Sequence, residues 1–221
     1  MTDTLAPLLA RLTGDEKHEP ASESTVDLIW ALYDRVLRVD PARPDAVDRD
    51  RFLVSKGHGP HAYYAVLAAK GFFPESWLDD LAGPDSRLGH HPDRTLIPGM
   101  EIGSGSLGHG LGLAVGVALG LRAQGLPGPR VYVLLGDGEL DEGANHEAIA
   151  YAGAVGLGSL TAIVVDNRSA SFRQDLVGLF TVHGWTGTTV DGRDHDRIER
   201  AVRGHAPGRP HVVAADVAGR P

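Results

Sequence analysis

Two apolar runs limit the fold of this chain more than any other feature of its sequence. The first, VYVLL at 131–135, contains no charged residue, and the second, TAIVVD at 161–166, is almost as apolar. Runs of this kind are typical of strands buried on both faces, as in a parallel sheet covered by helices. The helical segment between them lets the two strands lie parallel through one right-handed crossover. The sequence therefore predicts a βαβ unit in the second half of the chain.

The alternation of strands and helices extends over most of the 221 residues. Later strand candidates are TTVDG and HVVAAD, separated by the helical DHDRIERAV, and RFLV is a short apolar run before a Gly-His-Gly loop. Further helices are predicted from Ser24, as N-cap, to Asp40, before Gly71, and over LGLAVGVALGLRAQ and NHEAIAYAGAVGLG. We predict an α/β fold with a mostly parallel sheet and helices on both faces, in one domain that spans residues 1–221.

The composition excludes several classes of function. The chain has no Cys, which removes disulfides, thiolate zinc sites and a cysteine nucleophile. A net charge of -8, scattered basic residues and 6% aromatic residues argue against nucleic acid as a partner. No apolar run approaches ~18 residues and no signal-peptide pattern begins the chain, so we expect no membrane association and a cytoplasmic location.

Two polar side chains follow the two apolar runs directly. Asp137, between Gly136 and Gly138, comes after the first run, and Asn167 comes after the second. Both should emerge at the carboxyl ends of parallel strands, where open α/β sheets bind ligands. A carboxylate and an amide oxygen suit Mg²⁺ that also binds phosphate oxygens, and glycine lets a backbone amide approach a phosphate. The alternative is that Asp-Gly is only a turn and Asn167 only caps a loop.

These residues carry a family resemblance. GDG, then 28 residues, then Asn resembles the thiamine diphosphate signature, and the wider match is to the transketolase family. The segment GDGELDEGANHEAIAYAGAVGLGSLTAIVVDN is similar to that family over its whole length. RFLVSKGHGPHAYYAVLAAKGFFP, GHHPD and GSGSLGHG resemble three further family segments in the same order. The resemblance runs from about residue 18 to the end and implies the thiamine diphosphate-binding fold.

The resemblance implies a cofactor site for thiamine diphosphate and Mg²⁺. Its metal ligands would be Asp137, Asn167 and the backbone carbonyl of Ser169. Its cofactor contacts would be His58 and Gly138 at the diphosphate, with Gly105 and Leu107 against the aminopyrimidine and diphosphate. For His58, a helix N-terminal cap is the alternative role.

Three catalytic positions follow from the same resemblance. His91 matches a histidine that faces the substrate, and Glu142 matches an acidic residue at the dimer interface. His18 falls where the family has the His of a Gly-His-Pro-Gly loop, or else lies in a frayed polar segment. The loop here, Lys17 to Ala21, has lost the family's glycines, which puts the family's usual substrate in question.

Other residues near these motifs are expected to have ordinary roles. Glu139 and Asp141 are expected to be only acidic residues of a first helical turn, where the helix dipole favours them. The glycines of GLGLAVGVALG are expected to permit close packing between helix and sheet.

The resemblance also implies a partner. Transketolases carry a second α/β domain whose glutamate contacts the aminopyrimidine, and residues 168–221 are expected to complete only the first sheet. The chain would then be the N-terminal subunit of a split transketolase that binds a pyrimidine-domain subunit in an α2β2 heterotetramer and transfers a two-carbon ketol unit between small-molecule substrates. One alternative is an α-type subunit of a 2-oxo acid dehydrogenase-like enzyme. Another is a binding or assembly subunit without turnover.

Overall fold

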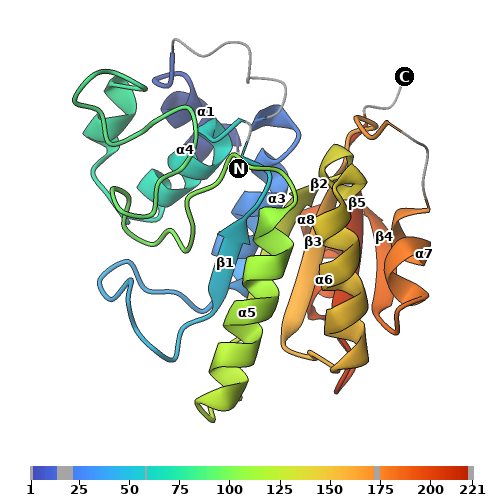
Figure 1. Cartoon of the computed structure of the whole chain (residues 1–221). Helices are drawn as coiled ribbons and strands as arrows, with labels where there is room; N and C mark the ends of the chain where they lie inside the picture. Colours follow the sequence, from blue (N-terminus) through green and yellow to red (C-terminus); the bar gives the residue numbers. More distant parts are fainter. Residues whose placement is uncertain (1, 14–21, 58, 172–174, 219–221) are drawn as a thin grey trace.

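A five-stranded parallel sheet forms the centre of the molecule (Figure 1). The computed structural model describes residues 2–13, 22–57, 59–171 and 175–218. The strands are β1 (Arg51–Val54), β2 (Val131–Gly136), β3 (Leu160–Asp166), β4 (Thr186–Asp191) and β5 (His211–Asp216), in the spatial order β1-β2-β3-β5-β4. Every neighbouring pair is parallel, so the predicted α/β fold with a parallel sheet is confirmed. The assignment of residues 1–221 to one domain stays a prediction.

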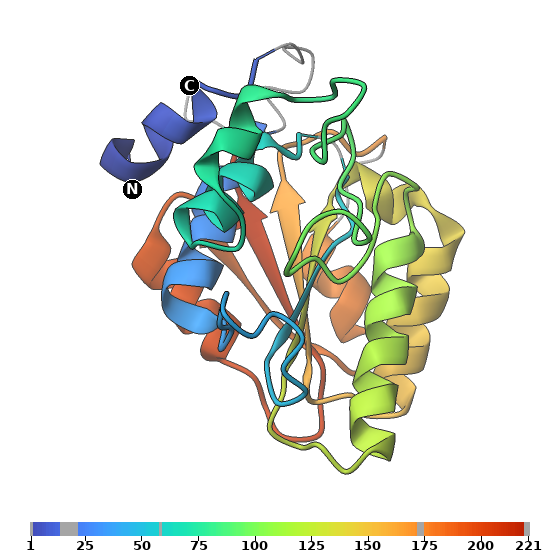
Figure 2. The ribbon, with the colours of Figure 1, turned by 90° about the vertical axis from the view of Figure 1, so that its left-hand side faces the viewer.

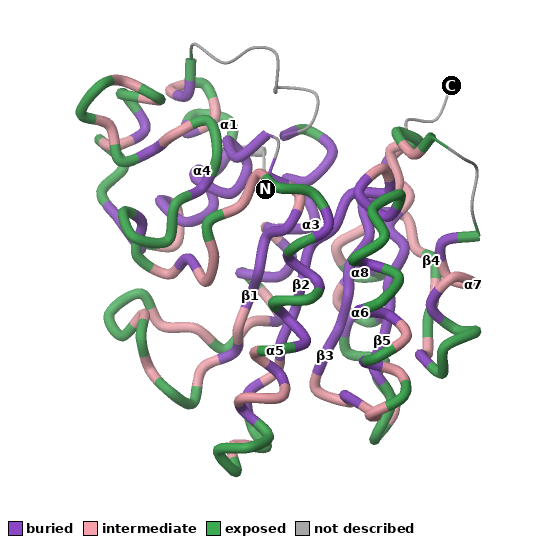
Figure 3. Tube along the Cα trace, viewed as in Figure 1, coloured by how far each residue is buried: buried purple, intermediate pink, exposed green. Residues whose placement is uncertain are grey.

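The burial of the strands follows their composition. All six residues of β2 are buried, as are the first six of β3, which matches their apolar sequences. β4 lies at the edge of the sheet and is mostly half-buried, with two exposed residues, Gly187 and Thr189. An edge strand packs against one neighbour only, so a polar, Thr-rich sequence is tolerated there. Figure 3 shows the same contrast between the purple central strands and the mixed colours of β4.

Helices cover both faces of the sheet (Figure 2). One apolar cluster joins α1 (Thr2–Leu9), α3 (Val26–Ala31), α4 (His61–Ala69) and α8 (His195–Arg203) to one face. A second cluster joins α5 (His109–Ala123), α6 (Gly143–Ala154) and α7 (Leu176–Thr181) to the other. Side chains alternate between these clusters along each strand: Val133 belongs to the second and Leu134 to the first. None of these helices is long and apolar enough to span a membrane, within the described residues.

The structure corrects one local expectation and shows two features that the sequence did not indicate. The helix predicted from Ser24 begins at Val26 with Thr25 as N-cap, and from Leu32 to Val36 it continues as a π-helix. The six-residue helix α7 was missed, and its N-cap Asp175 accepts a hydrogen bond from the Gly178 amide. The sequence also did not indicate that β5 lies between β3 and β4.

The glycines of α5 correct another expectation. If a Cβ atom were added to Gly112, Gly116 or Gly120, it would meet no atom of the described residues within 4 Å. These three glycines therefore face away from the sheet. They recur every four residues and therefore share one face of the helix, while Leu111 and Ala118 face the core. Gly110, at the start of the helix, does have the close packing that the sequence suggested.

Candidate functional site

Asp137 lies at the carboxyl end of β2, beside the end of β3. Its amide donates to the carbonyl of Val165 at 3.0 Å, which continues the β2–β3 ladder by one residue. The side chain is 1% exposed, and its two oxygens accept hydrogen bonds from the Gly138 amide and from the amide and hydroxyl of Ser169, at 2.5–2.8 Å. A buried carboxylate with several donors is held in one orientation at the end of the sheet.

Asn167 lies one residue beyond β3 and supplies the second polar group. Its Oδ1 atom is buried and has no hydrogen-bond partner among the described residues. Leaving a buried amide oxygen unsatisfied lowers the stability of the fold by about 1–3 kcal/mol. A metal ion or a hydrogen-bond donor that binds this oxygen would therefore be favoured here. Ser169 is close by: a Cβ at Gly138 would lie 3.2 Å from its carbonyl oxygen. The structure therefore brings Asp137, Gly138 and Ser169 together, with Asn167 at the adjacent strand end.

A second group of predicted residues gathers where three loops meet. Nδ1 of His91 lies 3.2 Å from the carbonyl oxygen of Gly57. A Cβ at Gly57 would lie 2.5 Å from the Gly105 amide nitrogen, and a Cβ at Gly105 would lie 3.1 Å from the His91 ring. Gly105 has φ of 130°, a conformation that favours glycine. The structure therefore places two predicted site residues, His91 and Gly105, against each other and beside Gly57.

Leu107 and Glu142 lie on the next part of this surface. Leu107 is 39% exposed. Glu142 is exposed at the N-cap of α6, and its side chain makes no capping hydrogen bond to the described backbone. A Cβ at Gly108, which has φ of 83°, would lie 2.7 Å from Cβ of Glu142. Gly108, the residue after Leu107, therefore lies against the side chain of Glu142.

Glu139 was expected to be an ordinary first-turn acid, and that expectation was wrong. It is 2% exposed and accepts hydrogen bonds from the Ser55 hydroxyl and from the amides of Gly108 and Gly136. Burial raises the pKa of Glu139, and these three hydrogen bonds oppose the shift. Asp141, the other acid expected to be ordinary, is exposed and accepts from the Ser171 amide at 2.9 Å.

Lys56 is a further charged residue that the motifs did not single out as a site residue. Its aliphatic stem passes over Gly136, since a Cβ there would lie 3.6 Å from Cγ and Cδ of Lys56. Burial lowers the pKa of Lys56 to about 8, and the nearby carboxylates of Asp137 and Glu139 oppose that shift. The sequence could have indicated Lys56, because it follows β1 within SKGH and β1 pairs with β2, which ends at GDG.

Two predicted site residues, His18 and His58, lie outside the described residues. Their roles stay predictions.

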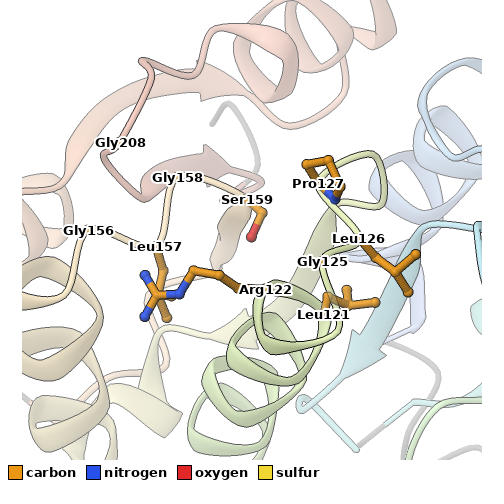
Figure 4. A pocket seen from close by; sticks show the side chains of 10 residues that line it. All are labelled: Leu121, Arg122, Gly125, Leu126, Pro127, Gly156, Leu157, Gly158, Ser159 and Gly208. Carbon is orange, nitrogen blue, oxygen red and sulfur yellow. The ribbon is translucent and has the colours of Figure 1, made fainter.

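A hollow of about 440 Å³ lies at the opposite end of the sheet (Figure 4). It is lined by loops that precede β2, β3 and β5, including Pro127, Leu157 and Gly208. It is therefore separate from the two groups of predicted residues. The first group follows the carboxyl ends of β2 and β3, and the second lies in the segment that follows β1.

Comparison with known proteins decides the family. The family described as "Transketolase, thiamine diphosphate binding domain" matches residues 14–217. The chain belongs to the transketolase family. Among solved structures, the transketolase from Leishmania mexicana superposes with a TM-score of 0.78 and 26% identity, over 93% of this chain and 37% of that chain. The predicted thiamine diphosphate-binding fold is thereby confirmed.

Relatives that this chain covers over most of their length include named subunits of transketolases. The chain is 37% identical to "6-deoxy-6-sulfo-D-fructose transketolase subunit SqwG" of Clostridium sp. (strain MSTE9), over 89% of this chain and 74% of the relative. It is 37% identical to an apulose-4-phosphate transketolase subunit of Actinobacillus succinogenes, over 90% and 75%. A protein named "Ferredoxin fas2" from Rhodococcoides fascians is 52% identical over 97% of this chain and 71% of that protein. The resemblance to split transketolase subunits, predicted from the motifs, is confirmed.

Proposed function

We propose that this chain is the thiamine diphosphate-binding subunit of a two-component, transketolase-like enzyme of the cytoplasm. With a pyrimidine-domain partner it transfers a two-carbon ketol unit from a ketose donor to an aldehyde acceptor. The observation that carries this proposal is the pair at the ends of β2 and β3, where Asp137 is buried and Asn167 Oδ1 has no partner among the described residues. The relatives named as transketolase subunits support the two-component form over a 2-oxo acid dehydrogenase-like subunit.

The residues present fit Mg²⁺ bound together with a diphosphate. One carboxylate from Asp137, one amide oxygen from Asn167 and one carbonyl from Ser169 would supply three oxygen ligands. Mg²⁺ prefers six oxygens, and phosphate oxygens and water usually complete the set. Bound thiamine diphosphate supplies the carbanion chemistry, and the protein orients it and excludes water.

The chain's own residues then have separate tasks. As the resemblance implies, the backbone at Gly138 would contact the diphosphate, and His58 is proposed to bind the same group. Gly105 and Leu107 would lie against the cofactor, and the exposed Leu107 would offer it apolar surface. His91, whose Nδ1 lies against the carbonyl oxygen of Gly57, would face the substrate and take part in proton transfer. His18, in the N-terminal segment, is proposed as a further catalytic residue, as the resemblance implies.

The outer face of α5 and α6 supports assembly with other chains. It presents the exposed Gly112 and Gly116, and also Leu113 and Tyr151, each 49% exposed. Exposed glycines and apolar side chains on a helical face allow another helix to approach closely. Glu142 lies at the N-terminal end of this face, where the resemblance places a dimer contact. We propose an α2β2 heterotetramer in which this face is covered.

The substrates differ between relatives of equal similarity. The two subunits that are 37% identical to this chain are named for a sulfonated ketose and for a ketose phosphate. Similarity by itself therefore selects no donor, and the reaction is specified here only as a two-carbon ketol transfer.

Calorimetric titration with thiamine diphosphate and Mg²⁺ tests the site. The titration uses the chain mixed with a pyrimidine-domain transketolase subunit. Asp137→Ala should abolish Mg²⁺-dependent binding, because the site loses its charged ligand. Asn167→Ala should weaken binding less, since an amide carries no formal charge. Asp191→Ala, at the end of the edge strand β4, is the control and should bind as the wild type does. Unchanged affinity in Asp137→Ala would contradict the site.

Light scattering and a ketol-transfer assay test the partner. The chain alone should bind the cofactor weakly and turn over no substrate, because half of the pocket would leave the ring in water. Mixed with the partner subunit, it should form a two-plus-two complex that is active. Strong ketol transfer by this polypeptide alone would exclude the two-component form.

A further inference from the structure

A buried carboxyl group connects the two halves of the candidate site. Oε1 of Glu139 accepts from the Gly108 amide at 3.0 Å and from the Ser55 hydroxyl, and Oε2 accepts from the Gly136 amide at 3.3 Å. The backbone carbonyl of Glu139 accepts from Nδ2 of the fully buried Asn145 at 2.6 Å. One residue therefore contacts the end of β2, the loop after β1 and the start of α5.

The hydrogen bond from the Gly108 amide to Glu139 satisfies a donor at the start of α5. Gly108 is the N-cap of α5, and the first amides of a helix have no acceptor within the helix itself. Glu139 provides that acceptor from a segment 31 residues further along the chain. The Gly110 amide is satisfied in the same way, because it donates to Oγ of Ser55 at 3.0 Å. The N-terminus of α5 is thus fixed to the ends of β1 and β2.

From this geometry we infer that Glu139 is a positioning residue of the cofactor site. It holds the loop of Gly105 to Leu107, which leads into Gly108, at a fixed place relative to the loop that begins with Asp137. The effect on cofactor binding rests on the proposed function, since both loops are assigned there to contacts with the cofactor or its metal. Glu139 itself is placed against neither the metal nor the cofactor, and it acts through the Gly108 and Gly136 amides.

Three hydrogen-bond donors surround the Glu139 side chain, and a carboxylate suits them better than an amide or a methyl group. A carboxylate accepts at both oxygens and can satisfy all three donors. Glutamine keeps one acceptor oxygen, enough for Gly108 and Ser55, but turns an NH₂ group toward the Gly136 amide. Alanine leaves all three donors without their acceptor. The effect should therefore increase from Glu139→Gln to Glu139→Ala.

Asp50 is a matched control within the same chain. It is 1% exposed, compared with 2% for Glu139, and its carboxylate accepts from the amides of Arg38 and Arg130 at 2.9 and 2.8 Å. It precedes β1 and therefore lies at the opposite end of the sheet. Asp50→Asn disturbs a buried, multiply bonded carboxylate without touching the loops of the site.

Hydrogen–deuterium exchange of the full chain without cofactor tests the connection itself. In Glu139→Ala the Gly108 amide should exchange roughly tenfold faster than in the wild type, after correction for the amides of β3, which report opening of the core. Glu139→Gln should give a smaller increase, and Asp50→Asn none after the same correction. Equal corrected exchange in the wild type and Glu139→Ala would overturn the inference.

Cofactor saturation of the complex with its partner subunit tests the consequence. The thiamine diphosphate concentration for half-maximal activity should rise roughly tenfold in Glu139→Ala, with kcat at saturation changed by less than about twofold. Asp50→Asn should keep the wild-type value. Faster exchange at Gly108 with unchanged cofactor saturation would overturn the positioning role. If the wild-type complex does not respond to thiamine diphosphate at all, the proposed function fails, whereas the exchange experiment still decides whether Glu139 fixes α5.

Discussion

Two glycines of α5 that are two residues apart should respond oppositely to the same substitution. Gly112 is exposed, and a Cβ there would meet no atom of the described residues within 4 Å. Gly110 is buried, and a Cβ there would overlap the Ser55 side chain and lie 2.8 Å from the Ser55 Cα atom. Gly112→Ala should therefore stabilise the fold, and Gly110→Ala should destabilise it.

The magnitudes follow from helix propensity and packing. Alanine is about 0.5–1 kcal/mol more favourable than glycine inside a helix, which is the expected gain in the free energy of unfolding for Gly112→Ala. At Gly110 the same gain is opposed by overpacking of about 1–3 kcal/mol and by strain on the Gly110–Ser55 hydrogen bond of about 1 kcal/mol. The net result is a loss of about 1–3 kcal/mol.

Thermal unfolding of the isolated chain measures both effects. For a chain of this size each kcal/mol moves the midpoint by about 2–4 °C, so Gly112→Ala should raise it by about 1–4 °C and Gly110→Ala should lower it by about 2–12 °C. Gly116→Ala and Gly120→Ala repeat the stabilising case, because they share the open face. Equal midpoints for the two main variants would refute the packing of Gly110 on Ser55. A loss of stability in Gly112→Ala would refute the open face.

Three further outcomes are expected. His91→Ala should lower turnover and leave cofactor affinity near the wild-type value, whereas His58→Ala should lower cofactor affinity. Steady-state kinetics with varied cofactor concentration test this difference. Similar behaviour of the two variants would contradict it. The free energy of unfolding should fall as the pH is lowered from about 7 to about 5, because burial lowers the pKa of His211 and the unfolded chain then binds a proton that the folded chain does not. His211→Gln should reduce the dependence of the unfolding free energy on pH. One titrating group can contribute at most about 1.4 kcal/mol per pH unit. If urea titrations of His211→Gln at several pH values gave the wild-type dependence, His211 would be excluded as a source.

The strands and their polar ends could be predicted because both signals are local. An uninterrupted apolar run such as β2 has few alternatives to a buried strand, and the residue after it, Asp137, must then lie at the edge of the sheet. The role of Glu139 could not be predicted in this way. Its carboxylate serves donors from Ser55 and Gly108, which are 84 and 31 residues away, and an acid after GDG has the same sequence pattern whether it is exposed or buried.

The glycines of α5 illustrate the same limit. A repeat of every four residues places Gly112, Gly116 and Gly120 on one face, but the pattern does not say which face. That choice depends on the larger side chains between them: Leu111, Ala114 and Ala118 pack on the sheet and turn the glycines outward.

The position of α5 should allow the proposed cofactor binding and the proposed assembly to be altered separately. Its N-terminus is held by Glu139 and Ser55 beside the loops assigned to the cofactor, whereas its outer face, with Gly116 and Leu113, is exposed in the described part of the chain. A substitution at the N-terminus changes where the cofactor loops lie, because the restraint acts through single hydrogen bonds to Gly108 and Gly110. A larger side chain at Gly116 leaves those bonds intact and changes only the surface that a second chain would meet. Loss of assembly without loss of the Gly108 restraint, and the reverse, are therefore distinct outcomes on one helix.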